Sequence, residues 1–328
     1  APSVVRVRDI DFRKSVFNVL PNGSRIIDNS SSALPLRLWR DLEEYGISAK
    51  ADLRLDFNLF GEDSNKLKLG FAYNERSRDF GTDMFSIGYK GSSLDLQGDY
   101  DNILNPDFIW NSEKETGSFV IGDYQPTNQY KADNRTIGGY FSSELRISEK
   151  LKAILGLRFE AYRVLYSGRA ISGELYRDNE FINVEDIYPS TNVIYSVNDQ
   201  TNIRASYSMT TARPSFKENS AANIYDPITE RFFVGNTSLV PTYINNFDLK
   251  WEHYGEENRF IALSAFFKKF KDPIEVNYFD ITTPNTLIAR NTQEAMVYGI
   301  EMSFNPTYGQ GMSSAALQAK ALSEALAG

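Results

Sequence analysis

The 328-residue sequence contains no cysteine and a single histidine, His253. Without cysteine there are no disulfides, thiolate zinc sites or cysteine nucleophiles. One histidine cannot build a site that needs two, and its place beside Trp251 in an alternating segment favours a membrane interface over catalysis. The acidic pairs at 185–186 and 256–257 are interpreted as solvated charge. No enzyme activity is therefore predicted, and no catalytic residue, metal site or cofactor.

Long apolar runs and an excess of positive charge are also absent. No stretch approaches the roughly 18 to 20 consecutive apolar residues of a helical membrane span, so any crossing must use strands. The net charge is -8, the isoelectric point is near 5.0 and no basic cluster is present, which argues against a nucleic-acid partner. Charged residues between 6 and 13 interrupt any signal-peptide core, so an exported protein is expected here in mature form or as a fragment.

What the sequence does contain is a long alternation of apolar and polar residues. From Ile47 to Leu59 every second residue is apolar, and every residue between is polar or charged. Successive side chains of a strand point to opposite faces, so this segment has one apolar and one ionic face. Ordinary strands run to about five or six residues. The longer pattern indicates a strand between lipid and a wet lumen.

The same alternation recurs along the chain, and nine strands are predicted in all. The eight others lie at 66–89, 136–147, 151–162, 193–197, 202–209, 246–252, 261–267 and 294–304. The apolar run at 84–89 is assigned to the strand that begins at 66, because a separate span would place the turn at 148–150 on the wrong side of the membrane. This strand is expected to project beyond the membrane.

Connections between the predicted strands alternate between short and long. Short turns are expected at 61–65, 148–150, 198–200 and 255–258, and long links at 90–126, 166–186, 213–240 and 271–293. Membrane barrels place short turns on the periplasmic side and long loops outside. The predicted fold class is therefore an all-β, antiparallel transmembrane β-barrel with long extracellular loops and short periplasmic turns.

Two end regions do not follow this pattern. Residues 1–40, with one weak alternation at Val5 and Val7, are predicted to be mainly extracellular loop, and the barrel is assigned to 41–305. Residues 306–328 are rich in alanine and leucine and have helical propensity. This tail is either a short native helix or an atypical, engineered end.

Three ordered elements lie within about seventy residues of the C-terminal half. They read Ala-Arg-Pro-Ser-Phe-Lys-Glu at 212–218, Gly-Asn-Thr-Ser-Leu-Val-Pro-Thr-Tyr-Ile-Asn-Asn-Phe-Asp-Leu-Lys-Trp-Glu-His-Tyr at 235–254, and Ala-Phe-Phe-Lys-Lys at 265–269. Their order and spacing closely resemble the barrel of TonB-dependent outer-membrane receptors, most of all those of Bacteroidota. A looser resemblance runs from Arg37 to Phe304.

The resemblance implies TonB-coupled uptake of a scarce nutrient across the bacterial outer membrane. The ligand stays open among iron chelates, vitamins, oligosaccharides and peptides. Expected partners are the TonB complex, reached through an N-terminal region not found here, a plug domain, outer-membrane lipid and a surface lipoprotein. Family barrels have about 22 strands. Nine would leave two edges in lipid, where each unpaired backbone group costs several kcal/mol, so part of a larger barrel is predicted.

Two other classes of function remain as alternatives. One is a passive porin or a secretion-associated barrel without TonB coupling, which would lack an upstream plug and TonB box. The other is a soluble all-β adhesion or binding protein, which would be extracted without detergent.

Candidate site residues fall into two sets. External-loop residues that combine aromatic rings with charges are expected to bind ligand: Arg213, Glu218, Tyr225, Asp226, Arg231, Phe232 and Phe233. For the first two, mutual pairing at the barrel rim is the alternative. Charged residues on the ionic strand faces are expected to line the lumen and to seat a hydrated plug or pass a polar solute: Lys50, Asp52, Arg54, Asp56, Arg158, Glu160, Arg204, Asp248 and Lys250. The alternative is that they only keep the wall hydrated. Trp251, His253 and Tyr254 are assigned to the periplasmic aromatic girdle.

Overall fold

Most of the chain is described by a computed structural model. The described residues are 2–14, 16–23, 25–27, 34–59, 62–91, 105–122, 126–255, 259–280, 282 and 285–305. The predicted tail at 306–328 and the acidic pair at 256–257 lie outside them. No helix of the described part is long and apolar enough to cross a membrane.

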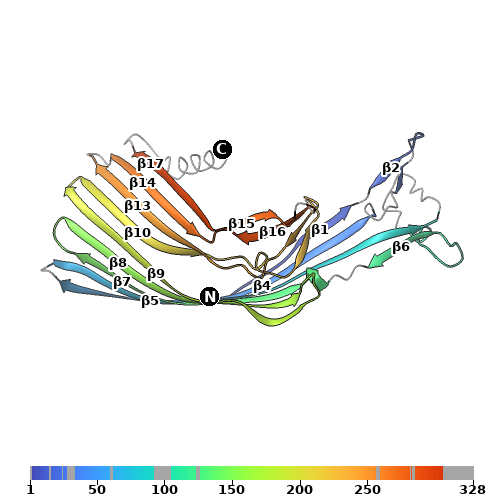
Figure 1. Cartoon of the computed structure of the whole chain (residues 1–328), viewed down its shortest axis with the longest axis horizontal. Helices are drawn as coiled ribbons and strands as arrows, with labels where there is room; N and C mark the ends of the chain where they lie inside the picture. The colour runs from blue at the N-terminus through green and yellow to red at the C-terminus, as the bar shows by residue number, and fades with distance from the viewer. Residues whose placement is uncertain are drawn as a thin grey trace.

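One large antiparallel sheet dominates the molecule. Ten strands follow each other in the order β1-β4-β5-β7-β8-β9-β10-β13-β14-β17, and a short strand, β6, attaches to β5. Their bounds are β1 Pro2–Lys14, β4 Leu36–Leu59, β5 Glu62–Lys90, β6 Gly117–Gly122, β7 Tyr130–Arg146, β8 Leu151–Arg169, β9 Leu175–Asn198, β10 Thr201–Ala212, β13 Thr242–Tyr254, β14 Phe260–Lys271 and β17 Glu294–Asn305. The sheet curves into an open trough (Figure 1). Among the described residues, β1 and β17 each pair on one side only.

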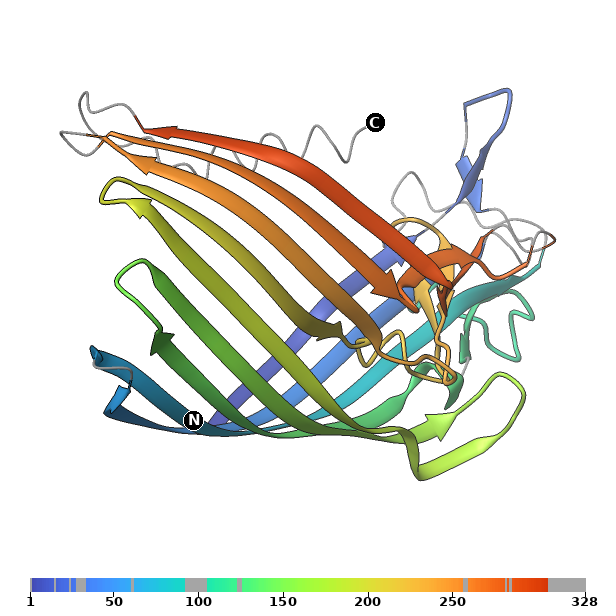
Figure 2. The same ribbon diagram turned by 60° about the vertical axis from the view of Figure 1, so that its left-hand side comes forward.

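Connection length is segregated between the two ends of the trough. Short turns join β4 to β5, β7 to β8, β9 to β10 and β13 to β14, and they gather at one end (Figure 2). Most connections at the other end are long and carry the smaller strands. Pro214 follows the end of β10 and Pro241 precedes β13, as expected of residues that cannot donate a ladder hydrogen bond. The predicted parity of the turns is confirmed.

All nine predicted strands are present, and β5 is a single strand across 66–89 as predicted. Two boundaries differ. Residues 62–65 belong to β5, where Phe57 of β4 pairs with Asn65, so they are not part of a turn. The expected long link at 166–186 is only the turn 170–174, because β8 and β9 stay paired as a hairpin up to Arg169 and Leu175, with two register shifts. After each shift the apolar residues continue on the other set of alternate positions, so the strand no longer shows one unbroken alternation in the sequence.

Strand β1 was not predicted and adds a tenth strand to the wall. Pro2–Lys14 pairs with β4 along its whole length, with a register shift between Arg8 and Ile10. The shift breaks the alternation after Val7, so only a weak pattern was visible in the sequence. Further along, Phe17–Val19 (β2) and Arg25–Ile27 (β3) form a small hairpin within the connection from β1 to β4.

Two long connections combine into a second, four-stranded sheet. Asn223–Asp226 (β11) and Arg231–Val234 (β12) come from the connection after β10, whereas Ile274–Tyr278 (β15) and Thr286–Asn291 (β16) come from the connection after β14. Their order is β11-β12-β16-β15, and the two connections meet in a parallel pair between β12 and β16. This sheet, called here the two-loop module, lies over the trough (Figure 1).

Candidate functional site: the inner face and the two-loop module

The inner face of the trough is defined here as the face against which residues 213–241 pack. Phe216, Ala221, Ala222 and Ile224 of that segment form a buried cluster with side chains of β5, β7 and β8: Phe80, Tyr130, Ala132 and Tyr166. The rings of Phe80 and Tyr130 stack at 5.1 Å, and those of Tyr130 and Tyr166 at 5.8 Å. An aromatic row across three strands therefore holds the connection on this face.

Further contacts between this connection and the inner face lie closer to β1. The Arg78 guanidinium lies 5.1 Å from the ring centre of Phe216 and forms an ion pair with Glu44 of β4. Lys14, at the end of β1, forms a 2.5 Å ion pair with Glu230 in the turn between β11 and β12. The connection that starts at β10 thus reaches across the trough to the strand at its opposite edge.

Outward-facing residues are apolar along the middle of the strands and charged nearer the end that carries the long connections. Phe71, Phe141 and Leu157 are 46% to 50% exposed on the outer face. Higher on the same face, ion pairs join Arg6 to Glu43, Lys131 to Asp79 and Arg163 to Glu180. The 29 residues of β5 far exceed the roughly 9 to 11 that a membrane strand needs. The apolar band marks the membrane, and the upper wall extends beyond it.

At the level of the band, predicted charged residues of the inner face form pairs, some along one strand and some across neighbouring strands. Lys50 lies 3.0 Å from Asp52, Arg54 lies 3.0 Å from Asp56, and Asp248 accepts a long hydrogen bond from Ser206. Arg204 and Lys250 both contact Glu252, at 2.6 and 3.0 Å, and Glu252 is only 4% exposed. Sequence reasoning had not selected Glu252, although its alternation places it on the same face as Lys250.

Near the centre of the wall, Glu160 holds two arginines. Its carboxylate pairs with Arg158 on its own strand at 2.5 Å and with Arg213, the first residue after β10. The Arg213 guanidinium also lies 4.2 Å from the ring centre of Tyr162. Arg213 therefore fixes the start of the connection onto β8. The alternative in which Arg213 pairs with Glu218 is wrong.

Glu218 instead caps a turn. Its carboxylate accepts the amide hydrogen of Ser215 at 2.7 Å, while the Ser215 hydroxyl accepts the amide hydrogen of Glu218. This reciprocal pair is a capping box, which satisfies two backbone donors at the start of a helical turn. The Ala-Arg-Pro-Ser-Phe-Lys-Glu element is thus explained by anchoring and capping.

The second element, at 235–254, locks the two loops of the module together. The Asn236 side-chain amide donates to the Ala289 carbonyl of β16 at 3.0 Å. Asn291, in the other loop, makes contacts in the opposite direction. Its side-chain amide donates to the carbonyls of Val240 and Asp272, and its side-chain oxygen accepts the Val240 amide hydrogen. Gly235 leaves no room for a side chain, since a Cβ there would lie 2.2 Å from the Ser220 carbonyl oxygen.

The other predicted ligand-binding residues of the module differ in the contacts that their side chains make. Asp226 accepts hydrogen bonds from the Ile228 amide and the Thr229 hydroxyl at 3.0 and 2.9 Å. Burial opposes ionisation of this carboxyl, but these bonds outweigh it and hold the pKa of Asp226 below its usual range. The Lys217 ammonium lies 4.5 Å from the ring centre of Phe233. The Tyr225 ring packs on Phe232 at 5.0 Å.

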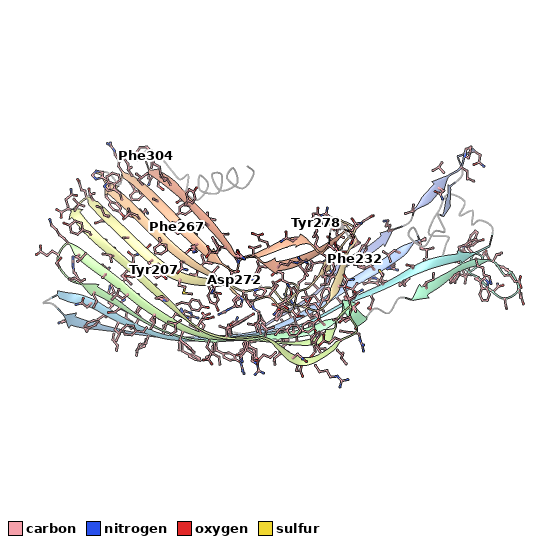
Figure 3. The ribbon with its side chains drawn as sticks, in the orientation of Figure 1. Tyr207, Phe232, Phe267, Asp272, Tyr278 and Phe304 are labelled. Atoms are coloured by element: carbon pink, nitrogen blue, oxygen red, sulfur yellow. The ribbon has the colours of Figure 1, made fainter. Side chains whose placement is uncertain are left out.

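Exposed aromatic rings remain on the module from both of its loops. Phe232 is 37% exposed on β12, and Arg231 beside it is exposed as well. Tyr278 at the end of β15 is 57% exposed, and Phe279 follows it at 44%. Figure 3 labels Phe232 and Tyr278 on the module above the trough. Sequence reasoning missed Tyr278 and Phe279, since only the parallel pairing of β12 with β16 brings them into one sheet with Phe232.

The short-turn end carries the predicted girdle residues on both faces. Trp251 and His253 stack at 6.0 Å, and Thr201 lies 3.0 Å from His253 Nδ1. The Tyr254 hydroxyl instead donates to Glu252, so Tyr254 belongs to the inner face. Further from the short turns on the outer face, Tyr207, Phe247 and Phe267 form an aromatic row across β10, β13 and β14. Figure 3 labels the first and the last of these residues.

Gly70 of β5 is required by a tyrosine that lies across it. A Cβ at this position would meet the Tyr140 ring at 1.9 Å, and the Tyr140 hydroxyl donates to Asp52 at 2.6 Å. We expect Gly70→Val to displace Tyr140 and destabilise the wall by about 1 to 3 kcal/mol, as other overpacked positions do. Urea unfolding of the full-length protein in lipid vesicles measures this. Gly139→Ala is the control, because its Cβ would meet only the Gly70 carbonyl at 3.9 Å. Equal midpoints for all three proteins would contradict the prediction.

A wide antiparallel sheet with a lipid-compatible outer band, an ionic inner face and segregated connections defines an outer-membrane β-barrel protein. Residues 6–323 match the family described as TonB dependent receptor-like, beta-barrel. The chain belongs to this family and is an outer-membrane protein with extracellular long connections and periplasmic short turns. No match was found among curated proteins.

Solved structures similar to this chain are receptors of the same architecture. FpvAI in its complex with pyocin S2 is 14% identical with a TM-score of 0.51, and the match covers 90% of this chain and 38% of that one. FpvA of P. aeruginosa bound to heterologous pyoverdines is 14% identical with a TM-score of 0.49, covering 90% and 34%. The siderophore receptor PirA from Acinetobacter baumannii is 18% identical with a TM-score of 0.46, covering 86% and 36%. The chain thus spans little more than a third of the length of these relatives, and the first shows the fold.

Proposed function

We propose that this chain forms part of the wall and the external loops of a receptor for TonB-coupled uptake of a scarce nutrient. Its family membership over residues 6–323 is the observation that carries the proposal. The TonB complex and a plug domain are the implied partners, and a surface lipoprotein is a further candidate. Several solved relatives are named for iron-carrying ligands, ferric citrate and ferripyoverdine among them. An iron chelate is accordingly the first ligand class to test, followed by vitamins, oligosaccharides and peptides.

The ionic inner face is proposed to line the lumen. Its charges of both signs neutralise each other in pairs and still leave exposed polar atoms, as on Lys50 and Asp52. Such a wall can hold a hydrated domain and can let a polar solute pass along it. It therefore supports a filled lumen better than a sealed hydrophobic one.

Energy coupling separates this proposal from a passive porin. We would express the full-length receptor in the outer membrane and measure accumulation of ⁵⁵Fe-citrate, labelled cobalamin, a maltooligosaccharide and a hexapeptide. At least one probe should accumulate against its gradient, and deletion of tonB or addition of an uncoupler should abolish the accumulation. Uptake that persists without TonB would support the passive barrel and reject coupling. The family membership itself gives no support to a soluble adhesion protein.

Ligand capture is proposed to use the exposed rings of the two-loop module. We expect Phe232→Ser combined with Tyr278→Ser to raise the apparent Kd of the transported probe about tenfold, since aromatic anchors often dominate binding energy. Phe119→Ser, which changes an exposed ring on β6 instead, is the matched control. Binding to whole cells at 4 °C measures the effect. An unchanged Kd in the double variant would remove these residues from the site.

A further inference from the structure

A hollow with an excess of positive charge opens on the inner face at the short-turn end. It encloses about 390 Å³ and lies between the ends of β5, β7, β8, β9 and β10. Except for Leu151, its strand residues, from Lys66 and Glu144 to Ser196 and Arg204, belong to the inner face by their alternation. The turn between β7 and β8 closes its lower rim.

Five of the residues that line the hollow are cationic and two are acidic: Lys66, Arg146, Lys150, Lys152 and Arg204, against Glu144 and Glu149. Lys66 and Lys152 share the carboxylate of Glu144 at 3.5 and 2.5 Å. One carboxylate cannot neutralise two ammonium groups. The hollow therefore keeps a positive balance, although the whole chain has a net charge of -8.

Ion pairs neutralise only part of this charge, because Glu252, the partner of Arg204 at 2.6 Å, is itself shared with Lys250. Glu144 is 16% exposed at its side chain, whereas Lys152 is 41% and Lys66 30% exposed, so both ammonium groups remain accessible from the lumen side. Ser196 and Asn202 hydrogen-bond to each other at 2.8 Å on the floor. A polar floor below accessible cations suits a ligand that offers several carboxylates.

We propose that this basic hollow docks an acidic peptide segment that occupies the lumen at the periplasmic end. The partner is identified by charge complementarity, since an acidic segment would neutralise the excess that Glu144, Glu149 and the shared Glu252 leave. A peptide fits better than a small free anion, because the cations are spread over four strands and a turn. The proposal rests on the lumen assignment made above, but it concerns a protein contact that transport measurements do not report.

Photocrosslinking in the full-length receptor tests the contact directly. p-Benzoylphenylalanine in place of Ser196 puts the probe on the floor of the hollow. Val197 is the matched control, because it is the next residue and is 41% exposed on the opposite face. After irradiation in outer membranes, mass spectrometry should find Ser196 joined to a peptide with at least two Asp or Glu residues, and Val197 joined to lipid only. Attachment of Ser196 to a neutral or basic peptide, or to no peptide, would overturn the proposal.

Charge reversal gives a second, independent measurement. Lys150→Glu combined with Lys152→Glu should lower the yield of the Ser196 crosslink at least about fivefold at low salt, with a smaller difference at high salt. Lys150→Glu alone changes only the turn, and it should still lower the yield if the double variant fails to fold. Lys68→Glu, an exposed residue of β5 outside the hollow, should leave the yield unchanged. Equal yields in all variants would mean that charge does not hold the peptide there. Loss of TonB dependence with the crosslink intact would reject the proposed function and keep the docking site.

Discussion

Glu160→Ala is expected to destabilise the barrel wall by about 3 to 5 kcal/mol, the usual cost of leaving buried charges unpaired. The carboxylate is 12% exposed and pairs with both Arg158 and Arg213, so its loss leaves two guanidinium groups close together without a counter-charge. Arg213→Ala should cost less, about 1 to 3 kcal/mol, because Glu160 keeps Arg158. The expected order of destabilisation is therefore Glu160→Ala above Arg213→Ala.

Urea unfolding of the full-length protein in lipid vesicles would measure both variants. Asp79→Ala is the control, since its ion pair with Lys131 is 57% and 71% exposed and such pairs contribute little. The double variant Glu160→Leu with Arg213→Met should recover part of the loss by removing one of the unpaired charges. If Arg213→Ala proved as damaging as Glu160→Ala, the shared-carboxylate explanation would be wrong.

Asn291→Leu is expected to separate the two loops of the module while the wall stays intact. Three hydrogen bonds disappear together: from its amide to the carbonyls of Val240 at 3.0 Å and Asp272 at 2.7 Å, and from the Val240 amide at 3.0 Å. At about 1 kcal/mol for each bond, the module loses about 2 to 3 kcal/mol locally. Asp272 has a positive φ of 54°, and its carbonyl would then keep the Thr242 hydroxyl as its side-chain donor.

Hydrogen exchange distinguishes local opening from global unfolding. We expect amides of β12 and β16 to exchange about 30 to 100 times faster in Asn291→Leu, with exchange in β7 and β8 unchanged. Asn291→Asp is the informative control, because a carboxylate can still accept the Val240 amide hydrogen but cannot donate to either carbonyl. It should therefore open the module nearly as much. Unchanged exchange in β16 would show that the parallel pair with β12 suffices to hold the loops together.

The strands of the wall could be predicted because each of their faces meets a different solvent. Lipid outside and water inside impose a period of two on every residue of a span, as at 47–59. Where that contrast weakens, prediction failed: β1 has a register shift after Arg8, and the upper β8–β9 hairpin has two more. A bulge exchanges the faces without changing the composition, so the strand continues while its pattern is lost.

For the candidate site residues too, alternation predicted the face on which a residue lies but not its contacts with distant residues. Charged inner-face residues such as Lys250 and Arg204 were found from alternation, which also places Glu252 on that face, but the contact of Glu252 with Arg204 depends on the register of β10 and β13. Arg213 was selected as a possible ligand contact from its motif, and the structure places its guanidinium against Glu160 and the Tyr162 ring. No local pattern links residue 213 to residue 160.

By itself the sequence determined that this protein crosses a membrane with strands and which end holds the long connections. These properties follow from composition along one strand and from the lengths between strands. Only the tertiary structure decided that the connections after β10 and β14 join into one module, with Phe232 and Tyr278 exposed on it. It also gathered the cations of the basic hollow from separate strands. Such contacts depend on the order and register of the strands, and register sets which distant residues become neighbours.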